Sequence, residues 1–168
     1  MASPMNYPPL KRHPALQPLS RDHYVGLVQA QRLLKAADAD VAARREAARQ
    51  FMSAWEAEIA EHFADEERLL PALIHQAGDR DRLLDEHTRL RALAAEAERS
   101  IAGEPGSDLL RALGTLLHDH IRWEERQLFP VIEAAANPDQ LTRLEEETHT
   151  IETSRPRSAC RPVEGVRE

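Results

Sequence analysis

Apolar residues recur along this chain at the three- to four-residue spacing of amphipathic helices. Ser20 is a suitable N-cap, and the apolar positions behind it are Leu27, Ala30 and Leu34. Asp40 can cap a second, longer helix, predicted from about 41 to 70. The apolar stripe of that helix consists of Phe51, Trp55, Ile59, Phe63 and Leu70. Pro71 ends or strains this helix, and the HQAGD stretch at 75–79 supplies a turn.

Two further helices are predicted in the second half. One spans about 80–102, and its inward positions are Leu83, Leu84, Leu90 and Leu93. The GEPG stretch at 103–106 is the clearest break, and Ser107 caps a fourth helix that stops or kinks near Pro130. The inward positions of that helix are Leu110, Leu113, Leu117 and Leu128. Four helices with short links predict an all-α fold, an up-down-up-down antiparallel four-helix bundle.

The two ends of the chain lack this pattern. Residues 1–19 contain five prolines and little periodicity, which predicts an N-terminal arm. The bundle is expected over residues 20–136. Residues 137–168 are expected to hold a short helix through Leu141 and Leu144 and then a flexible, disordered tail from Ser154.

Composition supports a helical protein and excludes several classes. The chain is 42% hydrophobic but only 4% aromatic, and it is rich in Ala, Leu, Glu and Arg, which favour helices. The net charge of −7, with arginines spread among the acids, argues against a nucleic-acid partner. No apolar run has membrane-spanning length and no signal-peptide core is present, so we expect no membrane association and a cytoplasmic location. A single cysteine, Cys160, excludes an intrachain disulfide and a cysteine-based zinc site.

The most informative pattern is a motif, H-x-x-x-E-E-R, that occurs twice. It stands in HFADEERLLP at 62–71 and in HIRWEERQLFP at 120–130. Residues i and i+4 share one face of a helix, so the histidine and the first glutamate of each copy project together from an apolar stripe. One further histidine precedes each copy on an earlier helix. The candidate cluster therefore consists of His23, His62, Glu66, His87, His120 and Glu124.

These six positions also agree in height along the predicted bundle. In antiparallel helices, residues equally distant from the turn between them lie in the same layer. The midpoints between successive members of the cluster fall near residues 42, 76 and 103, two of them in predicted turns and the first a few residues from one. The six side chains are thus predicted to meet in one buried layer.

A buried layer of this composition indicates a metal centre. Buried carboxylates without partners cost several kcal/mol each, and cations offset that cost. Imidazole and carboxylate together suit iron, manganese or zinc. Two bridging glutamates with two histidines per ion would form a symmetric dinuclear site that leaves positions open for a small ligand. By contrast, Glu67, Arg68, Glu125 and Arg126 are expected to be exposed, in salt bridges or as supports of the ligands.

Over about residues 16–135, the sequence resembles the hemerythrin-like (HHE cation-binding) family, through the two motifs and the two preceding histidines. The resemblance implies a four-helix bundle around a non-haem, oxo- or hydroxo-bridged di-iron centre, with manganese or zinc as possible substitutes. It makes His23, His62, His87 and His120 terminal ligands. Glu66 and Glu124 would be the bridges.

Two departures from the family pattern affect the expected function. Oxygen-carrying members have a second histidine one turn after the third-helix histidine, where this chain has Arg91. They also end in H-x-x-x-x-D, whereas Glu124 follows His120 at i+4. We therefore expect a more open site, with Glu58 or Asp65 as weak candidates for a further ligand.

Several functions fit this expectation. The first is binding of O2 or NO, or sensing of the redox or iron state. The alternatives are an enzyme acting on peroxide or nitric oxide, an iron donor for iron–sulfur cluster repair, or a mononuclear zinc structural site. A ferritin-like site is disfavoured because Glu146-x-x-His149 is the only Glu-x-x-His motif. The sequence leaves the oligomeric state and the redox partner open. The remaining histidines, His13, His75, His118 and His149, are interpreted as incidental.

Overall fold

The computed structural model describes residues 11–155. Most of these residues lie in α-helices, as the sequence predicts. Cys160 and most of the predicted tail lie outside this range. Within residues 11–155 every regular element is a helix, which confirms the all-α prediction. The α-helices are α1 (Gln17–Ala37), α2 (Val41–Ala54), α3 (Ala60–Leu69), α4 (Ala77–Ser100), α5 (Ser107–Trp123), α6 (Phe129–Ala135) and α7 (Pro138–Ser154). Shorter turns are the 3-10 helices η1 (Pro14–Leu16) and η3 (Pro71–Leu73) and the π-helices η2 (Trp55–Ile59) and η4 (Glu124–Leu128).

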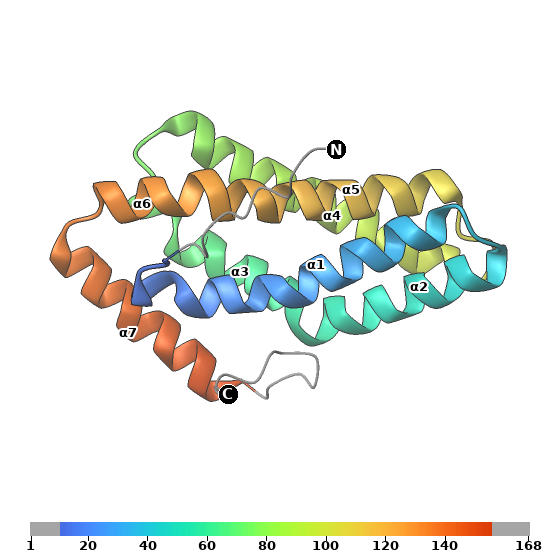
Figure 1. The fold of residues 1–168 in the computed structure, drawn as a ribbon, viewed down its shortest axis with the longest axis horizontal. Coiled ribbons are helices and arrows are strands. Elements are labelled where there is room, and N and C mark those ends of the chain that lie inside the picture. Colours follow the sequence, from blue (N-terminus) through green and yellow to red (C-terminus); the bar gives the residue numbers. More distant parts are fainter. Residues whose placement is uncertain (1–10, 156–168) are drawn as a thin grey trace, which may run out of the picture.

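The long helices lie side by side along the long axis of the molecule (Figure 1). α1 packs along α5 and beside α2, and α4 packs against both α5 and α2. α7 crosses one end obliquely and contacts η1 and the start of α1 (Figure 1). This packing places the inward faces of α1, α3, α4 and α5 around one interior.

Two π-helical turns interrupt the segments that the sequence pattern predicts as single helices. η2 joins α2 to α3 one turn before His62, and η4 joins α5 to α6 and contains Glu124. The helix thus continues past Pro130 instead of stopping there. The wider π turn gives the proline ring room beside the preceding carbonyl groups. η2 contains no proline, and we have no physical account of it beyond its position next to the cluster.

Several predicted boundaries are shifted by capping. Asp40 caps α2 as expected, accepting a hydrogen bond from the Ala43 amide at 2.8 Å. Ser20 is not an N-cap, because α1 already begins at Gln17, with Pro18 in its first turn. Gly106 replaces Ser107 as the N-cap of α5. α4 begins at Ala77, inside the stretch predicted as a turn.

The C-terminal helix is longer than the short one that the sequence predicts. Asn137 and Gln140 form a capping box, in which the Asn137 side chain accepts from the Gln140 amide and the Gln140 side chain accepts from the Asn137 amide. With Pro138 also in its first turn, α7 extends for 17 residues. Its buried Thr148 donates a hydrogen bond to the Ala15 carbonyl at 2.9 Å, which fixes α7 against η1.

Two apolar clusters fill the interior on either side of the candidate site. One contains Phe51, Phe63, Leu90, Leu113 and Leu117, and the other contains Leu16, Leu70, Leu83, Leu128 and Phe129. Along α4, for example, His87 lies between Leu83 of the second cluster and Leu90 of the first. The polar cluster is thus a thin layer between two apolar ones. Leu84, predicted to face inward, is instead 42% exposed.

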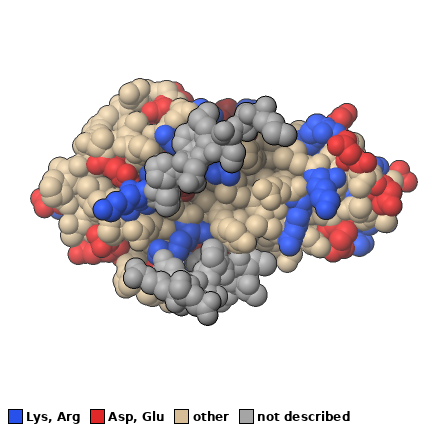
Figure 2. Space-filling view, viewed as in Figure 1, with Lys and Arg blue, Asp and Glu red and all other residues tan. Residues whose placement is uncertain are grey.

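The surface carries charges of both signs. On the face in Figure 2, lysine and arginine side chains are interspersed with aspartate and glutamate. None of the helices between residues 11 and 155 is both long and apolar enough to cross a membrane.

Candidate metal centre

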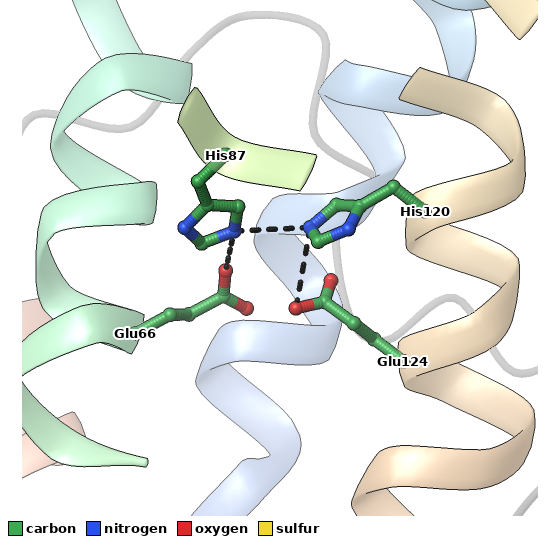
Figure 3. A group of neighbouring side chains, drawn as sticks. All are labelled: Glu66, His87, His120 and Glu124. Atoms are coloured by element: carbon green, nitrogen blue, oxygen red, sulfur yellow. Dashed lines mark hydrogen bonds and ion pairs between the residues drawn. The ribbon is translucent and has the colours of Figure 1, made fainter. Parts of the chain in front are cut away.

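All six predicted site residues converge in the interior. Each is at most 4% exposed. The members are His23 from α1, His62 and Glu66 from α3, His87 from α4, His120 from α5 and Glu124 from η4. Figure 3 shows four of them, with the rings of His87 and His120 facing each other beside the two carboxylates. The structure therefore brings together the side chains that the motif spacing and the height argument selected.

The cluster divides into two groups of possible ligand atoms. In the first, Nε2 of His62 lies 3.0 Å from Oε1 of Glu66. Nε2 of His23 lies 3.4 Å from the same oxygen and 3.1 Å from Oε2 of Glu124. This group therefore offers two imidazole nitrogens and one oxygen from each carboxylate.

The second group uses the other oxygen of each glutamate. Nε2 of His87 lies 3.4 Å from Oε2 of Glu66, and Nε2 of His120 lies 3.4 Å from Oε1 of Glu124. The donor atoms of Glu66, His87, His120 and Glu124 all lie within 4.8 Å of one another, a spacing that could hold a cation. His23, His62 and Glu66 meet the same criterion. Each carboxylate thus faces both groups, as a bridging ligand would.

Several inward-facing ligand atoms of the cluster lack the partners that a cation would provide. Both carboxylate oxygens of Glu66 and of Glu124 are buried without a hydrogen-bond partner among the described residues, and so is Nε2 of both His23 and His62. Leaving such atoms unpaired costs about 1–3 kcal/mol each, and more for charged groups. Nε2 of His87 and Nε2 of His120 lie 3.0 Å apart. Two lone pairs at that distance repel unless a cation or a proton lies between them. The residues present therefore fit a bound metal.

Outer carboxylates hold the histidine rings from behind. Nδ1 of His23 lies 2.6 Å from Glu125, and Nδ1 of His87 lies 2.9 Å from Glu67. The sequence interpretation of these two glutamates as exposed is wrong, since their side chains are 16% and 28% exposed. The alternative interpretation, as supports of the ligands, matches their positions. A neutral ring that donates from Nδ1 presents its Nε2 lone pair inward.

The other two histidines have outer carboxylates that sequence reasoning missed. Nδ1 of His120 lies 2.8 Å from Glu86, and Nδ1 of His62 lies 3.4 Å from Asp22. Each of these acids directly precedes the lone histidine of its half, in the pairs Asp22–His23 and Glu86–His87. An acid–histidine pair at equivalent places in both halves was a signal available in the sequence.

The outer contacts link the two halves of the chain. The second glutamate of each motif supports the lone histidine of the other half: Glu67 contacts His87, and Glu125 contacts His23. The acid before each lone histidine supports the motif histidine of its own half. The E-E pair in each motif therefore has two distinct roles, with the first residue pointing inward and the second crossing to a neighbouring helix.

These contacts shift the pKa values of the cluster. Burial by itself raises the pKa of Glu66, but contacts with His62, His23 and His87 outweigh it and lower the pKa well below its usual value. Burial likewise lowers the pKa of His23, yet its contacts with Glu124, Glu125 and Glu66 raise it well above the usual value. Against the effect of burial, the pKa of His120 is also raised, by Glu124 and Glu86, so in the absence of a cation protons on His23 and His120 offset the charge of the buried carboxylates.

Arginine side chains pair with three of the outer carboxylates, Glu67, Glu86 and Glu125. Arg91, which stands where the family resemblance led us to look for a further histidine, pairs with Glu67 at 2.7 Å. Arg82 pairs with Glu86 at 2.8 Å. The buried Arg12 pairs with Glu125 at 2.7 Å and also donates to its carbonyl. These guanidinium groups pair with the outer carboxylates, whereas no arginine among residues 11–155 pairs with Glu66 or Glu124.

A small cavity adjoins one half of the cluster. Its volume is about 10 Å³, at the lower limit of what holds one water molecule. The walls include His23, His62, Gly26, Ile59, Leu117 and Ile121. Glu58, a weak candidate for a further ligand, also lines it, with one carboxylate oxygen buried. The other weak candidate, Asp65, points instead to Arg155.

The remaining histidines lie apart from the cluster. His13 caps η1, its Nδ1 accepting from the Ala15 amide at 3.1 Å. His118 contacts Asp119 on the surface at 2.9 Å, and His75 and His149 are exposed. These positions agree with the interpretation of the four residues as incidental.

Comparison with known families identifies one match. The family model described as the hemerythrin HHE cation-binding domain matches residues 19–132, and it matches a second time over residues 80–154. No curated protein and no solved structure matches the chain.

Proposed function

This chain belongs to the hemerythrin HHE cation-binding family, and on that basis we propose that it is a non-haem di-iron protein that binds O2 or NO, or senses the redox or iron state. Its ligands are the four histidines and two glutamates of the cluster, within a four-helix up-down-up-down bundle. The observation that carries this proposal is the division of the Glu66 and Glu124 oxygens between two pairs of histidines.

The charges support a pair of cations. The outer carboxylates Glu67, Glu86 and Glu125 each have an arginine partner, whereas Glu66 and Glu124 have none among the described residues. Two carboxylates without an arginine partner in the interior favour bound positive charge, either protons on the histidines or cations. Mixed imidazole and carboxylate ligands suit iron, with manganese and zinc as substitutes. Iron bound there would supply redox chemistry and coordination positions for a small molecule.

The cavity beside His23 and His62 supports a diatomic ligand. Its volume of about 10 Å³ is close to the limit for one water molecule, so only a molecule of a few atoms could reach the cluster through it. Apolar side chains from Ile59, Leu117 and Ile121 line much of it. An uncharged diatomic molecule can enter such a space without losing strong hydration.

A metal-loading experiment tests the proposal. Fe(II) is added anaerobically to the metal-free chain, and bound iron is then counted and examined by Mössbauer and ultraviolet–visible spectroscopy. We expect two iron ions per chain and a charge-transfer band on addition of O2 or NO. Glu66→Ala should abolish dinuclear loading, whereas the exposed Glu147→Gln should not. Unchanged loading in Glu66→Ala would contradict the proposal.

A second candidate is an enzyme that acts on peroxide or nitric oxide. The observation that favours it is the pair of acids, Asp22 and Glu58, in the wall of the same cavity. Reduction of either molecule consumes protons, and carboxyl groups at the ligand could deliver them. Repeated, reversible appearance of the charge-transfer band would support binding. Steady consumption of peroxide or NO in the presence of a reductant would support the enzyme.

A further inference from the structure

The two halves of the cluster have the same kinds of inner ligand, two histidines and one oxygen from each glutamate. They differ in the outer carboxylates that lie behind the histidines of the repeated motif. His62 and His120 occupy equivalent places in the repeated motif, and the acid before the lone histidine supports each of them. Nδ1 of His120 lies 2.8 Å from Glu86, whereas Nδ1 of His62 lies 3.4 Å from Asp22. Aspartate is one methylene shorter than glutamate, which agrees with the longer distance.

This difference changes how firmly each ring is held. Glu86 accepts from the His120 ring and is itself held by Arg82 at 2.8 Å. A carboxylate on Nδ1 fixes the tautomer and orientation of an imidazole and makes Nε2 a better metal ligand. Nδ1 of His62 has no hydrogen-bond partner within residues 11–155. The His62 ring is therefore the least fixed of the four.

Ring packing differs less between the two halves than the outer carboxylates do. The ring of Phe63 stacks on His87, with centroids 4.0 Å apart and planes at 6°. Trp123 lies beside His120, with ring centroids 6.0 Å apart. His62 also has ring neighbours, His23 with centroids 4.9 Å apart and Phe63 with centroids 6.2 Å apart, but unlike His87 and His120 it borders the cavity.

We infer that the two metal positions are unequal. The ion held by His87 and His120 is retained tightly, and the ion held by His23 and His62 is exchangeable. The side-chain lengths at positions 22 and 86 set this difference. The inference rests on the proposed metal-binding function and specifies which position of the site gains and loses metal.

Exchanging the two side-chain lengths tests the inference. The chain is loaded with Fe(II) anaerobically, and release is followed with a chelator that absorbs visible light when it binds Fe(II). The wild type should release iron in two phases of equal amplitude. Asp22→Glu should slow the faster phase, and Glu86→Asp should accelerate the slower phase, each by about tenfold. Neither substitution should alter the other phase.

Controls separate this effect from general damage. Asp119→Glu lengthens a surface acid that contacts His118 at 2.9 Å, outside the cluster, and should change neither phase. Circular dichroism and unfolding of the metal-free variants check the fold. If either length variant fails to fold, the pair Asp22→Asn and Glu86→Gln replaces it, and only the second should alter release.

If the chain binds two ions, three outcomes would overturn the inference: one common release rate, an effect of Asp22→Glu on the slower phase, or an effect of Glu86→Asp on the faster one. Uptake of a single ion per chain would contradict the two-iron proposal by itself. If a single ion binds, the inference places it at His87 and His120. A release rate altered by Glu86→Asp alone would then uphold the inference, and a release rate altered by Asp22→Glu alone would overturn it.

Discussion

The carboxylate of Glu125 lies 2.6 Å from Nδ1 of His23, although 102 residues separate them in the sequence. Ser20 donates to the same oxygen at 2.5 Å, and Arg12 holds the other at 2.7 Å. Hydrogen bonds to His23 and Ser20 and the Arg12 contact outweigh the effect of burial and lower the pKa of Glu125 to about 2. The residue is therefore a fixed negative charge behind a candidate metal ligand.

Removal of that charge should weaken metal binding. Glu125→Gln keeps the shape of the side chain but loses the charge that orients His23 and raises its basicity, so we expect a loss of about tenfold or more in affinity. Competition with a chelator of known affinity measures it. Glu147→Gln, on the exposed partner of Arg68, is the matched control and should bind normally. Equal affinities in the two variants would contradict a supporting role for Glu125.

Bound metal should stabilise the fold. Because the ligands come from α1, α3, α4, α5 and η4, cations at the cluster bind the folded chain in preference to the unfolded one. Free metal at 100 times its Kd adds about 2.7 kcal/mol per site to the free energy of unfolding. Thermal unfolding with metal and with excess chelator measures the gain. The gain should largely disappear in Glu66→Gln, and a melting temperature insensitive to metal in the wild type would count against binding.

Metal affinity should fall as pH falls. Burial lowers the pKa of His23, but its contacts with Glu124 and Glu125 raise it well above its usual value, and the pKa of His120 is also raised. Protons therefore occupy these rings in the metal-free chain and must leave before a cation binds. A lower pH keeps the protons in place, and a higher pH removes them. Chelator competition between about pH 6 and pH 8, with proton release followed by an indicator dye, checks the sign. Affinity independent of pH over that range would be the contrary result.

A narrower cavity should slow ligand binding without loss of metal. A methyl group at Gly26 would lie 2.6 Å from Cδ1 of Ile121, which must then shift, and both residues line the cavity. We expect Gly26→Ala to cost about 1 kcal/mol of stability and to slow NO binding to the loaded chain. Stopped-flow spectroscopy measures the rate, and iron analysis verifies the loading. Gly78→Ala, at a position with no atom within 4 Å of the added carbon, is the control. Equal NO rates in both variants would argue for another route to the metal.

The sequence predicted the inner layer well and the outer layer poorly. The six inner residues follow from periodicity because a histidine and a glutamate four residues apart on an apolar stripe must share the buried face. The outer carboxylates do not follow from periodicity, since Glu67 and Glu125 lie beside the stripe and reach a neighbouring helix. Which helix they reach depends on packing angles that a single-helix pattern does not contain.

Helix boundaries and the π turns also could not be predicted from the spacing of apolar residues, because they depend on local backbone geometry. Ser20 and Ser107 are good capping residues by composition, but Pro18 and Gly106 allowed the helices to begin earlier or at a different residue. The π turn at η4 was not predicted, because Pro130 alone is compatible with a stop, a kink or a wider turn. Leu84 followed the predicted apolar face and is nevertheless exposed, since it lies at the edge of the stripe.

The exchange of outer carboxylates between halves has a consequence for biosynthesis. His23 emerges early from the ribosome, but its supporting acid, Glu125, is made only after most of the chain has been translated. A nascent chain that ends after the first motif lacks His87 and His120. It also lacks Glu125, the acid that contacts His23. All six candidate ligands and their outer carboxylates are therefore present together only after translation has passed the second motif.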